Sequence, residues 1–319
     1  MEGAITTGST ASMNHFMIDT DSVVDDAHAI MMAFAHPEAH IEAITTVAGG
    51  VSLERATANA CIILDVLERD VPVYAGCGRA LVAEDTPDAS FVMGKDGLGD
   101  SGYPPSKRRV ADEHAVHALI RLANASPGEL TLVTIGPLTN LALATRLDPT
   151  LPKKYERLVV MGGSIRGLGN ITPAAEFNVY ADPEAAAIVF DAWPGLTLIS
   201  WETTMDHSLT AEQVETLMTM DSPRAEFFRR ISRGMIEFDY QFLGRRLPEA
   251  DASAVAVALE PDIVRKAEAH YVQIELAGHH TRGQTAVDWY DQTGREPNVN
   301  LVLEMDIQRL WELMQAAVR

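Results

Sequence analysis

The sequence predicts an α/β protein with a single domain, in which a predominantly parallel central sheet with a Rossmann-like core is flanked by helices. Short apolar, β-branched segments alternate with segments of helical periodicity, which is typical of repeated β-α-β units. The length of 319 residues allows two domains, but α/β folds of this size are often single. The chain contains no internal repeat and no low-complexity segment.

The expected elements follow one another along most of the chain. Strands are expected at residues 16–18, 40–47, 71–76, 130–135, 157–161, 196–200, 270–276 and 298–303. Helices are expected from residue 27, at 52–69, at 112–125, after the turn 136–140, from 210, at 222–244, at 252–259 and from 306. Two segments, 78–112 and 167–181, lack periodicity, and a loop as long as the first is usually functional or mobile.

Composition excludes several classes of partner. The 45 acidic and 25 basic residues give a net charge of −20, which argues against binding to nucleic acid. Cys61 and Cys77 form neither a disulfide framework nor a zinc motif, so a reducing compartment is expected. No apolar run approaches the roughly 20 residues that span a bilayer, and residues 1–13 do not resemble a signal peptide. We expect a cytoplasmic protein with a flexible N-terminus (1–13), one domain (14–319) and no membrane partner.

Four carboxylates lie close together between the first strand and the first helix: Asp19, Asp21, Asp25 and Asp26. In a strand Asp19 and Asp21 point to the same side, while Asp25 and Asp26 lie where acidic residues favour the start of a helix. Carboxylates that converge on one point repel one another unless a cation or a shared proton relieves the repulsion. We therefore expect a bound metal at the carboxyl end of this strand, with a capped helix beside a solvated loop as the alternative.

Further candidate ligands follow later strands. The segment 167–181 holds Asn170, Glu176 and Asn178, whose donors and acceptors suit the hydroxyl groups of a sugar, although turn formation explains such residues equally well. Asp251 precedes the small-residue helix 252–259, so it either caps this helix or is a ligand directed back at the sheet.

Four separated motifs, in the same order, resemble those of the calcium-dependent nucleoside hydrolases of the inosine-uridine-preferring type. This family cleaves the N-glycosidic bond of ribonucleosides. The resemblance covers nearly the whole chain, and its combination of motifs is specific although each motif alone is weak. The motifs are the acids of 19–26 (DxDxxxDD), Ile135-Gly136-Pro137-Leu138-Thr139-Asn140, Met161-Gly162-Gly163 with Ala175-Glu176-Phe177-Asn178, and Asp251 of a late His-Asp pair.

The resemblance implies a role for each matching residue. Ca²⁺ would be held by Asp21, Asp26, Asp251 and the backbone carbonyl of Ile135. The riboside substrate would be bound by Asp25, Met161, Asn170, Glu176, Phe177 and Asn178. Asp21 would also be the catalytic base that activates a calcium-bound water, and the reaction would pass through an oxocarbenium-like transition state to ribose and free base. The family further implies a homodimer or homotetramer.

The departures from the family pattern concentrate on the base side of the site. Gly50 stands where the family has Asn, Met93 and Ala250 replace two histidines, and Ser22-Val23 replaces Pro-Gly. Metal and ribose binding are therefore expected to be retained, whereas another group must activate the leaving base. The candidates are Tyr240, Trp201, Glu249, Asp239 and His207. Core packing explains Trp201 and Tyr240 equally well, and a surface position is the better explanation of His207.

Two other functions fit part of the sequence. Residues 16–23 also resemble the DxDxT/V motif of haloacid-dehalogenase-type phosphatases, with Asp19 as nucleophile and Mg²⁺ as cofactor, but that resemblance leaves Asp25, Asp26 and Asp251 unexplained. The second alternative is a related protein that binds a riboside or calcium with little turnover, because the base-side residues are altered. An EF-hand is excluded, since the required Gly and Glu are missing. Segments 78–112 and 222–244 are expected to form a lid over the base.

Overall fold

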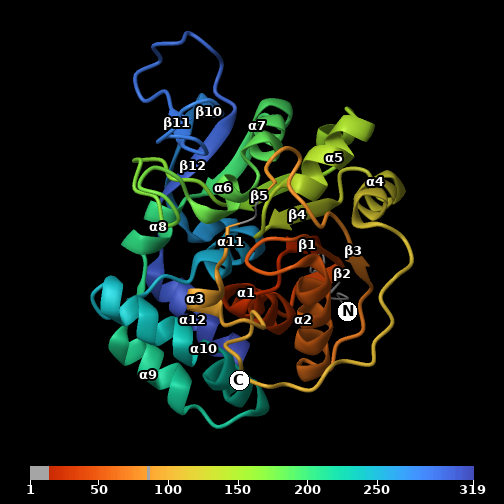
Figure 1. Ribbon diagram of the computed structural model, residues 1–319, viewed down its shortest axis with the longest axis vertical. Helices are drawn as coiled ribbons and strands as arrows, with labels where there is room; N and C mark the ends of the chain where they lie inside the picture. Colours follow the sequence, from red (N-terminus) through yellow and green to blue (C-terminus); the bar gives the residue numbers. More distant parts are fainter. Residues whose placement is uncertain (1–13, 85–86) are drawn as a thin grey trace, which may run out of the picture.

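The computed structural model describes residues 14–84 and 87–319, so the expected flexible N-terminus lies outside the described residues (Figure 1). An eight-stranded sheet, in the order β3-β2-β1-β4-β5-β6-β12-β9, runs through the molecule. All neighbouring strands are parallel except β12 and β9. The prediction of a single α/β domain with a predominantly parallel sheet is confirmed. The strands of this sheet are β1 (Asn14–Thr20), β2 (Ala39–Thr46), β3 (Val73–Ala75), β4 (Leu130–Thr134), β5 (Arg157–Met161), β6 (Leu196–Ile199), β9 (Val264–His270) and β12 (Val299–Met305).

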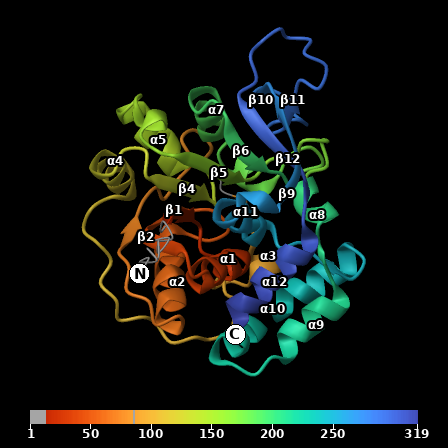
Figure 2. The same ribbon diagram turned by 180° about the vertical axis from the view of Figure 1, so that it is seen from behind.

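Helices cover both faces of the sheet (Figures 1 and 2). One face packs against α1 (Val24–Ala35), α2 (Leu53–Val66), α11 (Ala250–Leu259) and α12 (Ile307–Val318). The other packs against α4 (Ala115–Ala125), α5 (Thr139–Leu147) and α7 (Pro183–Ala192). Beyond the first layer lie α9 (Ala211–Thr219) and α10 (Pro223–Phe242), and short helices α3 (Ser90–Met93), α6 (Phe177–Ala181) and α8 (Trp201–Asp206) follow strand ends or loops.

Smaller elements complete the fold. The hairpin of β10 (Val272–Ile274) and β11 (Thr285–Val287) projects from the end of the molecule that lies away from α9 and α10, as both ribbon views show. The other elements are the two-stranded pair β7 (Leu209–Thr210) and β8 (Arg246–Leu247) and the 3₁₀ turns η1 (Leu151–Lys153) and η2 (Pro261–Ile263). No helix in the described part of the chain is long and apolar enough to cross a membrane.

The central strand β1 shows why the apolar segments form a buried sheet. Phe16 and Ile18 pack into the hydrophobic core on the α1 side, and Met17 between them packs into the core on the α5 side. Strands that are buried on both faces require continuous apolar sequence rather than alternation, and 16–18 meets this requirement. The chain then leaves the sheet at Thr20, directly before the cluster of acids.

The sequence missed several elements. α7 and α8 were not expected, the two irregular segments each contain a short helix (α3 and α6), and the strand expected at 270–276 is instead β9 followed by β10. The start of α7 carried a signal, because Asp182 caps it through the N–H of Ala185 and Pro183 occupies its first turn. β9 carried no such signal, because it is an edge strand with charged, largely exposed residues, and these do not give the apolar pattern by which a strand is predicted.

Candidate active site

A cavity of about 360 Å³ opens at the edge of the sheet where the parallel strands end. Ligands of open α/β sheets bind at this edge, because the loops after several strands converge there. The cavity brings together twelve of the candidate site residues that the sequence singles out, from positions 21 to 251. They are Asp21, Asp25, Asp26, Ile135, Met161, Asn170, Glu176, Phe177, Asn178, Trp201, Asp239 and Asp251.

Three carboxylates form the acidic floor of the cavity. Asp25 and Asp26 lie in the first turn of α1 and Asp251 in the first turn of α11, and each places one oxygen within 4.8 Å of the others. Burial raises the pKa of Asp25 to about 7, with the neighbouring charge of Asp26 adding to the effect. The pKa values of Asp26 and Asp251 are raised well above 3.8, chiefly by burial and then by the surrounding carboxylates. Without a counter-ion, these groups therefore favour the protonated form.

The floor has the properties of a site for a hard cation. All its donors are carboxylate oxygens, which Ca²⁺ and Mg²⁺ prefer. Asp25 Oδ1 is buried and has no hydrogen-bond partner within residues 14–84 and 87–319. An unpartnered carboxylate oxygen beside two other acids is costly unless a ligand compensates it. The residues present therefore fit a divalent metal ion.

Asp21 lies beside this floor and is held in a fixed orientation. It follows β1 directly, is 3 % exposed, and its Oδ2 accepts a hydrogen bond of 2.5 Å from the backbone N–H of Gly50. Burial raises its pKa to about 7, against the lowering effect of the Gly50 N–H. Asp26 is fixed in a similar way, because its carboxylate accepts hydrogen bonds from the Thr20 hydroxyl and from the Val23 N–H. Both carboxylates are thus positioned by the chain before any ligand binds.

Asp19 has a structural position behind the cavity. Its side chain is fully buried, and Oδ1 accepts hydrogen bonds from Thr45 Oγ1 at 2.5 Å and from Asn140 Nδ2 at 2.8 Å. Asn140 also donates to the carbonyl of Thr46 at 3.0 Å and accepts from the N–H of Cys77 at 2.8 Å. Together with Asn140, Asp19 thus connects the carboxyl ends of β1, β2 and β3. It does not line the cavity. The phosphatase alternative, which needs Asp19 as an accessible nucleophile, does not fit this geometry.

Glu176 and Asn178 of the third motif stabilise a turn and also line the cavity. Glu176 caps α6, accepting hydrogen bonds from the N–H groups of Gly163, Asn178 and Val179 at 2.7, 2.8 and 3.1 Å. Asn178 Nδ2 donates to the carbonyl oxygen of Ile135 at 3.2 Å, so this carbonyl is directed at the site. Asn170 Oδ1 accepts from the N–H of Phe177 at 2.8 Å. Turn formation is therefore confirmed for this segment, and the same residues also line the cavity, so the contact with sugar hydroxyl groups stays a prediction.

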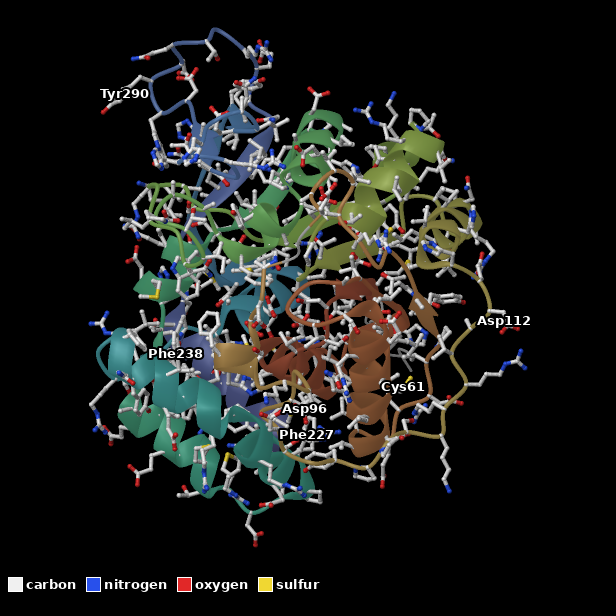
Figure 3. The ribbon with its side chains drawn as sticks, viewed as in Figure 1. Cys61, Asp96, Asp112, Phe227, Phe238 and Tyr290 are labelled. Carbon is white, nitrogen blue, oxygen red and sulfur yellow. The ribbon has the colours of Figure 1, made fainter. Side chains whose placement is uncertain are left out.

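The wall opposite the acids is apolar and aromatic. The ring of Phe238 lies 5.5 Å from that of Phe91 and 4.5 Å from that of Phe242, measured between centroids. Figure 3 shows Phe238 projecting from α10 beside α3. Other apolar residues that line the cavity include Ala89, Val92, Met93, Trp201, Met235, Leu243, Pro248 and Ala250. Segments 78–112 and 222–244 thus both contribute to the wall, and their role as a lid over the base stays a prediction.

Comparison with known proteins identifies the family. The model of the inosine-uridine preferring nucleoside hydrolase family matches residues 16–312. The chain belongs to this family. It is 33 % identical over 304 residues to the pyrimidine-specific ribonucleoside hydrolase RihB of Escherichia coli (strain SE11), covering 95 % of this chain and 96 % of that protein.

Two solved structures extend the similarity to the whole fold. A plant nucleoside hydrolase, the PpNRh1 enzyme, superposes with a TM-score of 0.90 at 32 % identity and covers 96 % of this chain and 99 % of its own. An inosine-guanosine nucleoside hydrolase gives a TM-score of 0.90 at 32 % identity, covering 96 % of this chain and 98 % of its own. The predicted family and the prediction of an enzyme that hydrolyses ribonucleosides are confirmed.

The structure separates the candidates for the leaving-group side of this nucleoside hydrolase. Trp201 and Asp239 line the cavity, whereas Tyr240 and Glu249 do not. The guanidinium of Arg245 lies 5.4 Å from the ring centre of Tyr240, outside the cavity wall. Glu249 Oε2 lies 3.0 Å from Nδ1 of the buried His28. His207 is engaged by the backbone of Thr203 and Met305, which is a structural arrangement.

The aromatic residues of α3 and α10 are the part of this site that sequence reasoning missed. Phe91, Phe238 and Phe242 carry no family motif and lie in segments whose packing partners are far away in the sequence. The spacing of Phe238 and Phe242 does place both on one face of a helix. Which face would meet the cavity depends on how α10 packs, and the sequence does not specify this.

Proposed function

We propose that this nucleoside hydrolase binds Ca²⁺ at its acidic floor through Asp26 and Asp251, together with Asp21 and the carbonyl of Ile135. Asp21 also serves as general base in the hydrolysis of a ribonucleoside to ribose and free base. The observation that carries the proposal is the convergence of Asp25, Asp26 and Asp251 within 4.8 Å, with one buried oxygen of Asp25 unpartnered. Asp21 and the carbonyl of Ile135 line the same cavity and complete a set of oxygen donors. Carboxylate and carbonyl oxygens of this kind are the ligands that Ca²⁺ prefers.

Each residue of the site then has a separate role in the reaction. A cation bound to these carboxylates would lower the pKa of a water molecule and orient it. Asp21, held by the Gly50 N–H, takes a proton from the attacking water. Asp25, Asn170, Glu176 and Asn178 offer donors and acceptors to the ribose hydroxyl groups, with Met161 and Phe177 beside them. The carboxylates stabilise the positive charge that develops on the ribose ring as the bond to the base breaks.

The part of the cavity proposed to hold the base suits binding by aromatic stacking rather than by several hydrogen bonds. Its walls are formed by Phe91, Phe238, Phe242 and Trp201, with Met93 and Ala250 where histidines were expected. Aromatic side chains stack on the face of any base and therefore bind several bases. The relatives differ in this respect, since one is named for pyrimidine nucleosides and another for inosine and guanosine. We propose that this chain accepts more than one base.

The direct test is release of free ribose from a panel of purine and pyrimidine ribonucleosides by the wild type and by Asp21→Ala. We expect the wild type to release ribose and the variant to lose at least about 10³-fold in kcat, because removal of a general base costs about 10²–10⁴-fold and Asp21 also contributes to the metal site. Turnover by Asp21→Ala at the wild-type rate would contradict the assignment of Asp21. A wild type that binds a riboside but releases no ribose would support the binding-protein alternative.

Two broader expectations stay predictions. The homodimer or homotetramer implied by the resemblance is a proposal that sedimentation velocity of the purified protein tests. The cytoplasmic location is likewise a proposal, which is supported by the two cysteines: Cys61 and Cys77 are both free and buried.

A further inference from the structure

One face of α10 forms a wall of the cavity. The residues of this face are Met235, Phe238, Asp239 and Phe242, which follow the i, i+3, i+4, i+7 spacing of one helical face. Three of them are apolar, as the inner face of a covering helix should be. Asp239 is the exception, because it places a carboxyl group in the middle of an apolar stripe.

The environment of Asp239 gives the side chain no structural role. The residue is 7 % exposed, and within residues 14–84 and 87–319 its carboxyl group has no side-chain hydrogen bond or ion pair. Neither carboxyl oxygen is among the fully buried unpartnered atoms, so both reach the open space of the cavity. A carboxyl group on an otherwise apolar helix face is unfavourable for packing, and a shift by two positions along α10 would place it at the exposed positions 237 or 241. Burial raises its pKa to about 7, with the charges of Asp25 and Glu249 adding to the effect. An unpartnered acid that faces a substrate cavity is a candidate for contact with the substrate.

The reaction needs such a group at this wall. When an N-glycosidic bond breaks, both bonding electrons pass to the base, and a proton on the base makes it a better leaving group. Met93 and Ala250 have no acidic proton to give, and Tyr240 and Glu249 lie outside the cavity wall. The indole N–H of Trp201 can donate a hydrogen bond but is not a practical acid.

We propose, on the basis of the function proposed above, that Asp239 contacts the base of the bound ribonucleoside and gives it a proton as it leaves. The proton passes from the carboxyl oxygen of Asp239 to a nitrogen or oxygen of the base while the bond between the base and the anomeric carbon breaks. The water oxygen bonds to the anomeric carbon and its proton passes to Asp21. One water is consumed, and exchange with solvent returns a proton to Asp239 and removes one from Asp21.

The test compares two substrates that differ in their need for this proton. The first is the best ribonucleoside of the wild type, and the second is p-nitrophenyl β-D-ribofuranoside, whose leaving group is stable as an anion. The variant Asp239→Asn keeps the size of the side chain and cannot supply the proton. Glu237→Gln is the matched control, because it makes the same chemical change at an exposed position of the same helix.

We expect Asp239→Asn to lose about 100-fold or more in kcat on the ribonucleoside and to stay within about 3-fold of the wild type on the nitrophenyl riboside. Glu237→Gln should match the wild type on both substrates. Equal loss on both substrates, or no loss on either, would overturn the role of Asp239 while leaving ribonucleoside hydrolysis intact. A wild type that cleaves neither substrate would contradict the proposed function, and the role of Asp239 with it. Retained cleavage of the nitrophenyl riboside also demonstrates that the variant is folded.

Discussion

The backbone N–H of Gly50 donates a hydrogen bond of 2.5 Å to Oδ2 of Asp21. This contact joins the loop after β2 to the loop after β1, two neighbouring parallel strands whose carboxyl ends meet at the cavity. Only Oδ2 of Asp21 accepts this hydrogen bond; Oδ1 does not. The backbone of an adjacent strand end therefore contributes to the orientation of the proposed general base.

The neighbouring Gly49 is expected to be essential for this orientation. A Cβ at this position would lie 2.2 Å from Asp21 Oδ2 and 2.7 Å from Asp21 Cβ, so rotation of the carboxylate alone would not relieve the clash and Asp21 itself would have to move. We expect Gly49→Ala to lose about 10²-fold in kcat, since a misplacement of about 1 Å in catalytic geometry has a cost of this order. The measurement is ribose release at saturating ribonucleoside.

Gly50→Ala is the matched control for this prediction. Its Cβ would approach Val23 Cγ1 at 3.2 Å, Ala89 Cβ at 3.3 Å and Asp21 Oδ2 at 3.4 Å, which small shifts can relieve. We expect it to lose less than about 5-fold in kcat, since the displacement of Asp21 is small. Equal losses in the two variants would show that the orientation of Asp21 does not limit the reaction.

Asp251→Asn should abolish the stabilisation by Ca²⁺ without lowering the stability of the metal-free protein. The substitution removes one of three converging carboxylates. Because burial and neighbouring acids oppose its charge, the metal-free variant should melt at or above the temperature of the wild type. The increase in Tm on adding Ca²⁺ should be lost, since that increase reflects binding to the native state alone. Thermal unfolding with chelator and with Ca²⁺ measures both, and an undiminished increase would exclude Asp251 from the site.

Stability without metal should fall as pH rises. The pKa values of Asp21 and Asp25 are raised from 3.8 to about 7 in the folded protein, so between these values the folded state binds more protons than the unfolded state. Their contribution to stability is complete below about pH 4 and is lost as pH rises through about 7. In chelator, Tm should therefore decrease between pH 5 and pH 8.

Calcium should reverse this trend, because it binds the ionised carboxylates. The increase in Tm caused by Ca²⁺ should be larger at pH 8 than at pH 5. A calcium effect that is independent of pH would mean that these carboxylates do not release protons when the metal binds.

Removing the central aromatic ring of the base wall should weaken substrate binding. Phe238 packs against both Phe91 and Phe242, so Phe238→Ala removes stacking area and loosens its two neighbours. Stacking of a base on an aromatic side chain contributes about 1–3 kcal/mol, which corresponds to a decrease in kcat/KM of about 5- to 150-fold. Tyr290→Ala, at an exposed position of the projecting loop far from α10, is the control (Figure 3).

The sequence predicted the part of the site that follows the ends of the parallel strands. Asp21 and Ile135 directly follow a buried strand, Met161 ends one, and Trp201 lies two residues after one. Parallel topology alone brings such positions to one edge. Asp251 is more distant in sequence, yet it too could be placed, because an acid at the head of an apolar helix is conspicuous.

The base side could not be predicted in the same way. Tyr240 and Asp239 are adjacent in the sequence, but only Asp239 lines the cavity, because α10 turns the two side chains by about 100° from each other. The direction in which α10 faces is set by packing against elements that are distant in sequence, among them α1, α3 and α12. Short elements such as α3 and α8 were missed because few residues contribute to their periodicity.

The most direct test of the central claim is ribose release measured before and after removal of metal. The wild type should release ribose from at least one ribonucleoside, lose this activity in chelator, and regain it when Ca²⁺ is restored in excess. Activity that is unchanged after metal removal, with the absence of bound calcium verified by elemental analysis, would contradict the account. The acidic floor of Asp25, Asp26 and Asp251 would then have a function other than holding the metal for hydrolysis.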